Sequence, residues 1–159
     1  MLLGKPTELR ERVAPGRRLL GLDLGAKTIG LALSDTGWRI ASPLETIRRT
    51  RFGADAERLF QLVDEHDVGG LVLGLPVNMD GSEGPRCQST RQFAANVLGI
   101  RDLPIAFWDE RLSTQAVERM LIEEVDATRK RRAQLVDKLA AAYILQGVLD
   151  NIAGENRGQ

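Results

Sequence analysis

Two short apolar segments separated by a tight turn constrain the fold of this chain more than any other feature. The segments are Leu19–Leu24 and Ile29–Leu33, and the turn between them is Gly25-Ala26-Lys27-Thr28. Apolar runs joined by such a turn are typical of a β-hairpin, in which Gly25 supplies the backbone freedom. The sequence therefore predicts two antiparallel strands at the start of the core.

Asp23 is the one acidic residue inside this hairpin. An ionised carboxylate in a core strand costs several kcal/mol unless a partner compensates its charge. Two interpretations are open for Asp23 alone. Its side chain caps the turn through Asx-type hydrogen bonds, or it binds a hard cation such as Mg²⁺, which prefers oxygen ligands.

Strands and helices alternate after the hairpin. Apolar residues recur with helical spacing from Ala56 to Val63, which predicts an amphipathic helix ended by Gly69. Leu71–Leu75 is a continuous apolar run, typical of a strand buried on both faces of a parallel sheet. Further expected elements are a strand at 43–48, a helix from Pro85 to a stop at Gly99, a strand at 105–108, a helix capped by Ser113 and a last helix from about Ala133 to Leu149.

This order of elements predicts an α/β fold, a mixed sheet with helices on both faces. In such sheets, sites form at the carboxyl ends of the parallel strands. With 159 residues, the chain suits one compact domain, which we place at residues 17–151. Residues 1–16 are polar and lack periodicity, so we expect a loose N-terminal arm, and we expect a frayed, disordered tail at 152–159.

Composition excludes several classes of function. The chain has 22 basic and 22 acidic residues, so any contact with a polyanion must come from local patches. No apolar stretch approaches the length of a membrane span. The single cysteine, Cys87, rules out an internal disulfide and fits a reducing cytoplasm. The single histidine, His66, falls at a helix end among acidic residues, so no Ser-His-Asp triad or Cys-His pair is in prospect.

Two further acidic positions are candidates for a site. Asp109 and Glu110 follow a predicted strand at the site-forming edge, although a solvated loop pair is the alternative. Adjacent residues at a strand end face opposite sides, so only one of them can easily reach a shared metal. Asp137 shares a predicted helix face with apolar residues, namely Ala140, Ala141, Ile144 and Val148. A carboxylate in such a stripe needs a buried partner or a cavity, which favours a functional role.

Local basic clusters are the candidates for contact with a phosphate backbone. Residues 129–132 carry four positive charges where the last helix opens. These charges oppose the helix dipole and suit phosphate better than they suit the fold, although a solvated run is the alternative. Asp80 lies in the loop after Leu75, where a turn through Asp80-Gly81 is the favoured interpretation. The candidate substrate-binding residues are Lys27, Asp80, Arg111, Arg129, Lys130, Arg131, Arg132 and Lys138.

Three carboxylates from the first strand, a strand end and the last helix can thus converge on one point. Clustered carboxylates repel each other, and divalent cations offset that repulsion and supply hydrolytic chemistry. Metal-assisted hydrolysis of phosphodiesters needs only residues that this chain has. We therefore expect Asp23, a member of the Asp109-Glu110 pair and Asp137 to form one metal-dependent site.

Four ordered motifs carry a resemblance to a known family. LGLDLGAKTIGLALSD, LVLGLPVNMDGSEG, WDERLST and LVDKLAAAYIL together resemble the bacterial YqgF family over roughly residues 18–150. These ribonuclease H-like proteins are similar to Holliday junction resolvases and are regarded as nucleases for the ends of precursor 16S ribosomal RNA. The resemblance implies a five-stranded sheet with an antiparallel second strand. It also implies that Asp23, Glu110 and Asp137 are the catalytic, metal-binding residues, with Mg²⁺ or Mn²⁺ as cofactor.

The implied partners are structured RNA or branched DNA and ribosomal particles in the cytoplasm, and the sequence is compatible with a monomer or a homodimer. Three other interpretations of the function stay open. The chain resolves Holliday junctions, or it is a non-catalytic nucleic-acid or ribosome-assembly adaptor, or it is related to ATPases of the actin, Hsp70 and sugar-kinase type. The last of these needs two ribonuclease H-like halves, and the chain has one such hairpin.

Overall fold

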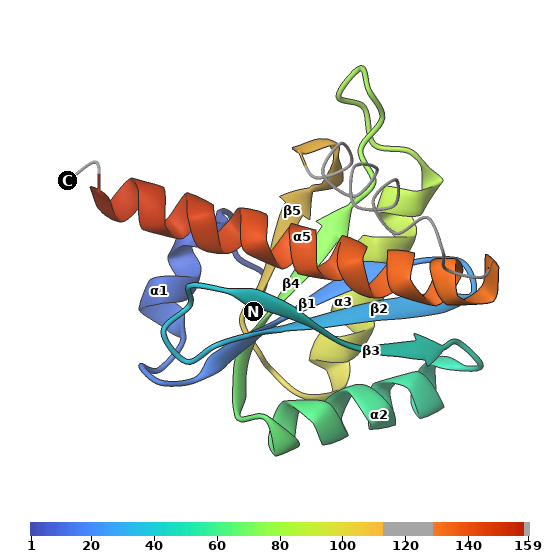
Figure 1. Ribbon diagram of the computed structural model, residues 1–159, viewed down its shortest axis with the longest axis horizontal. Coiled ribbons are helices and arrows are strands. Elements are labelled where there is room, and N and C mark those ends of the chain that lie inside the picture. The colour runs from blue at the N-terminus through green and yellow to red at the C-terminus, as the bar shows by residue number, and fades with distance from the viewer. Residues whose placement is uncertain (113–128, 158–159) are drawn as a thin grey trace.

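A computed structural model describes the backbone of residues 1–112 and 129–157, and the side chains of residues 1–112 and 138–155. Its centre is a five-stranded sheet with the order β3-β2-β1-β4-β5 (Figure 1). The strands are β1 (Arg18–Leu24), β2 (Thr28–Ser34), β3 (Ala41–Arg48), β4 (Val68–Leu75) and β5 (Ile105–Asp109). β2 is antiparallel to both β1 and β3, whereas β4 is parallel to β1 and β5. The expected mixed sheet with an antiparallel second strand is confirmed.

Helices cover both faces of this sheet (Figure 1). α2 (Phe52–Glu65) and α3 (Pro85–Ile100) pack on one face, and α5 (Arg129–Arg157) crosses the other. Short helical turns complete the described chain: η1 (Pro6–Glu8), α1 (Leu9–Arg12) and η2 (Glu110–Leu112). None of the helices in the described ranges combines the length and the apolar character needed to cross a membrane.

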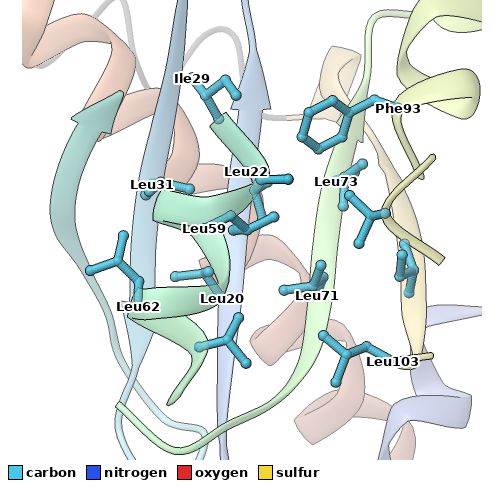
Figure 2. Packing of buried hydrophobic residues seen from close by; sticks show 14 of the residues in the cluster. Leu20, Leu22, Ile29, Leu31, Leu59, Leu62, Leu71, Leu73, Phe93 and Leu103 are labelled. Carbon is cyan, nitrogen blue, oxygen red and sulfur yellow. The ribbon is translucent and has the colours of Figure 1, made fainter. Parts of the chain in front are cut away.

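The larger core lies between the sheet and the α2–α3 layer. Leu20 and Leu22 of β1 and Leu71 and Leu73 of β4 point toward Leu59 of α2 (Figure 2). All eight residues of β4 are buried, which confirms that its apolar run is covered on both faces. Residues that alternate with these along the strands, such as Leu19, face α5.

The N-terminal residues do not form the loose arm that their composition predicts. The backbone of Leu3 donates to the Ile105 carbonyl at 2.9 Å, and the Ile105 backbone donates to the Met1 carbonyl at 2.9 Å. Leu9 is fully buried and Val13 nearly so. The apolar residues of this segment are too widely spaced to show a period, but they cover the edge of β5 and the base of the sheet.

Two helix ends also differ from expectation. α2 ends at Glu65, and Asp67, with a φ of 54°, turns the chain into β4, so Gly69 lies in the strand. A Cβ on Gly69 would lie 2.5 Å from Val13 Cγ1, so this glycine serves close packing. The predicted tail from residue 152 continues α5 to Arg157, with its first residue buried. The helix expected after Ser113 lies outside the described residues.

Candidate functional site

Two of the predicted acidic residues meet at the carboxyl ends of the strands. Asp23 is the penultimate residue of β1, and Glu110 directly follows β5. β4 lies between these strands and pairs with both. The two half-buried carboxyl groups are in contact, and protonated Glu110 forms a hydrogen bond with Asp23.

Gly74 of β4 creates the space that lets Glu110 reach toward Asp23. A Cβ at Gly74 would lie 2.5 Å from Glu110 Oε1 and 2.5 Å from Ile144 Cδ1 of α5. A side chain at this position would therefore clash with both groups, and at least one of them would have to shift. The contact between Asp23 and Glu110 thus depends on a glycine, which has no side chain, at position 74 of β4.

The environment of Glu110 favours its neutral form. Burial is the largest cause, and the negative charge of Asp23 and the hydrogen bond to it act in the same direction. Together they raise the pKa of Glu110 to about 8, although the nearby charge of Arg86 opposes the shift. In the metal-free protein, Glu110 is therefore mostly protonated at neutral pH.

The chemistry of this pair suits a divalent cation. Carboxylate oxygens are the donors that Mg²⁺ and Mn²⁺ prefer, and a cation between the two groups would relieve their repulsion. Within the described part of the chain, no cluster of three or more His, Cys, Asp or Glu side chains could hold a metal. A third protein ligand would therefore have to come from elsewhere in the chain.

Asp137 lies in α5, but its side chain is outside the described part of the structure. The same holds for the basic residues Arg129, Lys130, Arg131 and Arg132.

The course of α5 is nevertheless defined on either side of Ala141. Gln146 accepts a hydrogen bond from the Ala41 backbone at 2.9 Å, at the end of the sheet away from Asp23. The Ala141 carbonyl would lie 3.1 Å from a Cβ at Gly21, in the middle of β1. Toward its N-terminus, α5 thus runs toward the Asp23 end of the strand. Position 137 is about one turn further in that direction.

Asp109 is engaged by Arg111. The Arg111 backbone donates to Asp109 Oδ1 at 3.0 Å, and Nη2 donates to Oδ2 at 2.5 Å. These bonds, led by those of the side chain, hold the pKa of Asp109 below its usual range. Arg111 Nη1 also lies 3.4 Å from the carbonyls of Asn78 and Met79. Asp109 and Arg111 therefore join the end of β5 to the loop after β4.

The other predicted substrate-binding residues are dispersed. Asp80 accepts hydrogen bonds from the Ser82 backbone at 2.9 Å and from its hydroxyl at 2.6 Å, as the turn interpretation predicts. Lys27 is exposed in the β1–β2 turn. The pKa of Glu45 on β3 is lowered first by its hydrogen bond with Arg58 and also by the charge of Lys138, so Lys138 lies toward β3.

Sequence reasoning missed Gly74 and Arg86. Gly74 is one glycine in an apolar run, and its role appears only when β5 and α5 are packed against β4. Arg86 is an exposed arginine in the first turn of α3, a common surface feature. No pattern in the sequence connects it with Glu110, which lies 24 positions further along the chain.

Sequence comparisons relate the chain to a family of nucleases. Residues 17–151 match the RuvX family, described as "Holliday junction resolvase". A protein of Paramagnetospirillum magneticum named "Putative pre-16S rRNA nuclease" is 66% identical over 149 residues, covering 94% of this chain and 96% of its own length. A protein of Rhodospirillum rubrum with the same name is 60% identical over 140 residues, covering 88% and 87%.

Comparison of folds leads to the same architecture. The structure titled "T. thermophilus RuvC in complex with Holliday junction substrate" matches with a TM-score of 0.55 at 15% identity, covering 86% of this chain and 96% of that one. At this identity the match concerns the fold alone. The fold is ribonuclease H-like, as the sequence motifs imply.

Proposed function

We propose, since the chain belongs to the RuvX family, that it is a divalent-metal-dependent nuclease that processes the ends of precursor 16S ribosomal RNA. The resemblance to YqgF proteins is thereby confirmed. The observation that carries the proposal is the contact between Asp23 and Glu110 at the carboxyl ends of β1 and β5. The names of the curated relatives support the ribosomal RNA substrate.

In this proposal Asp23, Glu110 and Asp137 hold Mg²⁺ or Mn²⁺. When bound, the metal supplies an activated water and offsets charge on the leaving oxygen. Glu110 must first lose its proton, because only its carboxylate form binds a cation well. Asp23 lies on β1 and Glu110 directly follows β5, so the paired strands of the sheet orient both side chains before substrate arrives.

A second candidate substrate is branched DNA. The family description and the RuvC fold favour it, because both concern Holliday junction resolution. The two candidates share one catalytic site and differ in the nucleic acid bound beside it. A ribosomal RNA substrate would place the protein in the cytoplasm with ribosomal particles as partners, whether it acts as a monomer or as a homodimer.

The test is a cleavage assay with precursor ribosomal RNA ends and four-way DNA junctions side by side, with Mg²⁺, with Mn²⁺ and with excess chelator. We expect cleavage of the RNA ends with either metal and none in chelator. Asp23→Asn and Glu110→Gln should be inactive. Arg39→Ala is the matched control, because Arg39 is exposed between β2 and β3, at the far end of the sheet. Preferential cleavage of the junctions would instead support the second candidate, and full activity in chelator would exclude the metal mechanism.

A further inference from the structure

A cavity of about 210 Å³ lies beside the β1–β2 turn, at the same end of the sheet as the carboxylate pair. Three segments meet around it: the turn itself, the residues after β3 and the first turns of α3. Its lining consists of Leu24, Gly25, Ala26, Arg49, Arg86, Ser89 and Thr90. Among the described residues of this lining, the charged side chains are both arginines and none is acidic.

The charge of this cavity differs from that of a second, larger cavity. A larger cavity of about 400 Å³, between the N-terminal turns and the end of α5, is lined by both signs of charge: Lys5, Arg10, Glu8, Glu11 and Glu155. Its charges nearly balance, so it indicates no class of ligand. In a chain with equal numbers of acidic and basic residues, two arginines without a carboxylate indicate an anion site.

Arg49 is held in place by neutral groups. Its Nη1 donates to the Gly25 carbonyl at 2.7 Å, and its backbone donates to the Lys27 carbonyl at 2.8 Å. Its guanidinium carbon lies 6.0 Å from the ring centre of Phe93, a buried residue at the end of the core (Figure 2). An arginine has five N–H donors. Within the described part of the chain, the guanidinium of Arg49 donates one hydrogen bond, to the Gly25 carbonyl, so donors remain for a ligand.

Arg86 connects the cavity with the carboxylate pair. It lines the cavity, and its charge lowers the pKa of Glu110 against the larger effects of burial and of Asp23. No carboxylate among the described residues forms an ion pair with Arg86 or Arg49. Two cations that form no ion pair within the described residues thus lie next to the proposed metal site.

We infer, building on the nuclease function proposed above, that the cavity of Arg49 and Arg86 binds a phosphate group of the nucleic acid next to the phosphodiester to be cut. Arginine forks match phosphate geometry, and the hydroxyl of Ser89 adds a polar group to the wall. A phosphate held here would fix the position of the nucleic-acid strand relative to Asp23 and Glu110. The phosphate belongs either to an internal phosphodiester or to a 5′ end.

The test measures binding without cleavage, by fluorescence anisotropy of labelled precursor ribosomal RNA in chelator. We expect Arg49→Ala and Arg86→Ala each to weaken binding by about tenfold and to lower the slope of log Kd against log salt by about 1. Arg39→Ala should bind like the wild type. Arg86→Lys should recover part of the affinity because it keeps the charge. Thermal unfolding checks that each variant is folded, and Arg49→Lys serves as the second variant if Arg49→Ala is not.

The source of the phosphate is determined with modified strands. One arm compares a 5′-phosphate with a 5′-hydroxyl, and the other moves a single neutral methylphosphonate along the strand. The modification that removes or neutralises the phosphate bound in the cavity should weaken binding by the wild type. The same modification should have little further effect on the affinity of Arg49→Ala or Arg86→Ala. Additive effects at every position, or wild-type affinity in both variants, would overturn the inference. Arginine-dependent binding without any cleavage in Mg²⁺ or Mn²⁺ would instead contradict the nuclease proposal and leave the cavity assignment standing.

Discussion

At the scale of single residues, the group with the most consequences is the Glu110 carboxyl, whose pKa is raised to about 8 by burial and by Asp23. A cation that binds this group at pH 7 must displace its proton. We predict release of about one proton for each binding event. Calorimetric titration with Mn²⁺ in buffers of different ionisation enthalpy measures this number directly.

The matched control for this titration is Asp109→Asn. Asp109 is paired with Arg111 and its pKa is lowered, so its loss should leave proton release unchanged. Glu110→Gln should abolish the release. Equal release by the wild type and by Glu110→Gln would show that another group carries the proton.

The same residue predicts how the stability of the metal-free protein depends on pH. The pKa of Glu110 rises from an ordinary 4.5 to about 8 on folding, so the folded state holds the proton more tightly. The contribution of Glu110 to stability is therefore complete below about pH 4.5 and is lost as the pH rises through 8. The glutamine of Glu110→Gln stays neutral at every pH. The free energy of unfolding of this variant, relative to that of the wild type, should therefore increase by about 1 to 3 kcal/mol between pH 5 and pH 9. Urea unfolding in chelator at both pH values checks this, and a constant difference would contradict it.

Asp137 separates catalysis from stability. If it is a metal ligand, Asp137→Asn should abolish cleavage and leave the metal-free protein at least as stable, because one of several repelling charges is removed. If Asp137 is instead a partner of a buried cation, the same change should lower stability by about 3 kcal/mol. Thermal unfolding in chelator, beside the cleavage assay, gives both readouts. A destabilised variant that still cleaves would exclude Asp137 from the site.

At the scale of elements, the close packing of β4 against β5 and α5 positions Glu110. Gly74→Ala places a Cβ 2.5 Å from Glu110 Oε1 and from Ile144 Cδ1, so these side chains must shift. We expect the carboxyl group of Glu110 to move away from Asp23. We predict that the variant folds with a loss of about 1 to 3 kcal/mol, cleaves poorly and releases less than one proton on binding Mn²⁺.

Gly99→Ala is the control for this change, because a Cβ at Gly99 would meet nothing within 4 Å. It should fold, bind metal and cleave like the wild type. If Gly74→Ala released protons normally on binding Mn²⁺, the position of the Glu110 carboxyl group would not depend on the space that Gly74 leaves.

Elements with a strong local signal could be predicted from the sequence. The β1–β2 hairpin and β4 follow from apolar runs and a turn, and the meeting of Asp23 and Glu110 follows from their places at strand ends. Contacts between distant segments could not be predicted. The N-terminal strand pairing depends on an open edge at Ile105, and the role of Arg86 depends on how α3 is oriented on the sheet. The local sequence pattern of each segment contains no information about either of these contacts.

At the scale of the whole molecule, charge is balanced overall but separated locally. The equal numbers of acidic and basic residues give little long-range attraction to a nucleic acid. Recognition must then rest on a few short-range contacts, and these occur where α3, the β1–β2 turn and the end of β5 come together. The Glu110 carboxyl lies on the same side of β4 as Ile144 of α5, and the two arginines line the cavity beside α3, so a nucleic-acid strand that crosses this end of the sheet would meet both.

The pairing of the N-terminal segment with β5 has a consequence for the behaviour of the protein in concentrated solution. An open edge strand presents unpaired N–H and C=O groups to any other chain that can extend the sheet. Here Leu3 and Met1 satisfy both backbone groups of Ile105, while Pro43 interrupts the opposite edge, β3. A segment that carries no proposed catalytic residue thus closes the start of β5 to pairing with another chain, which discourages sheet-to-sheet aggregation at this part of the edge.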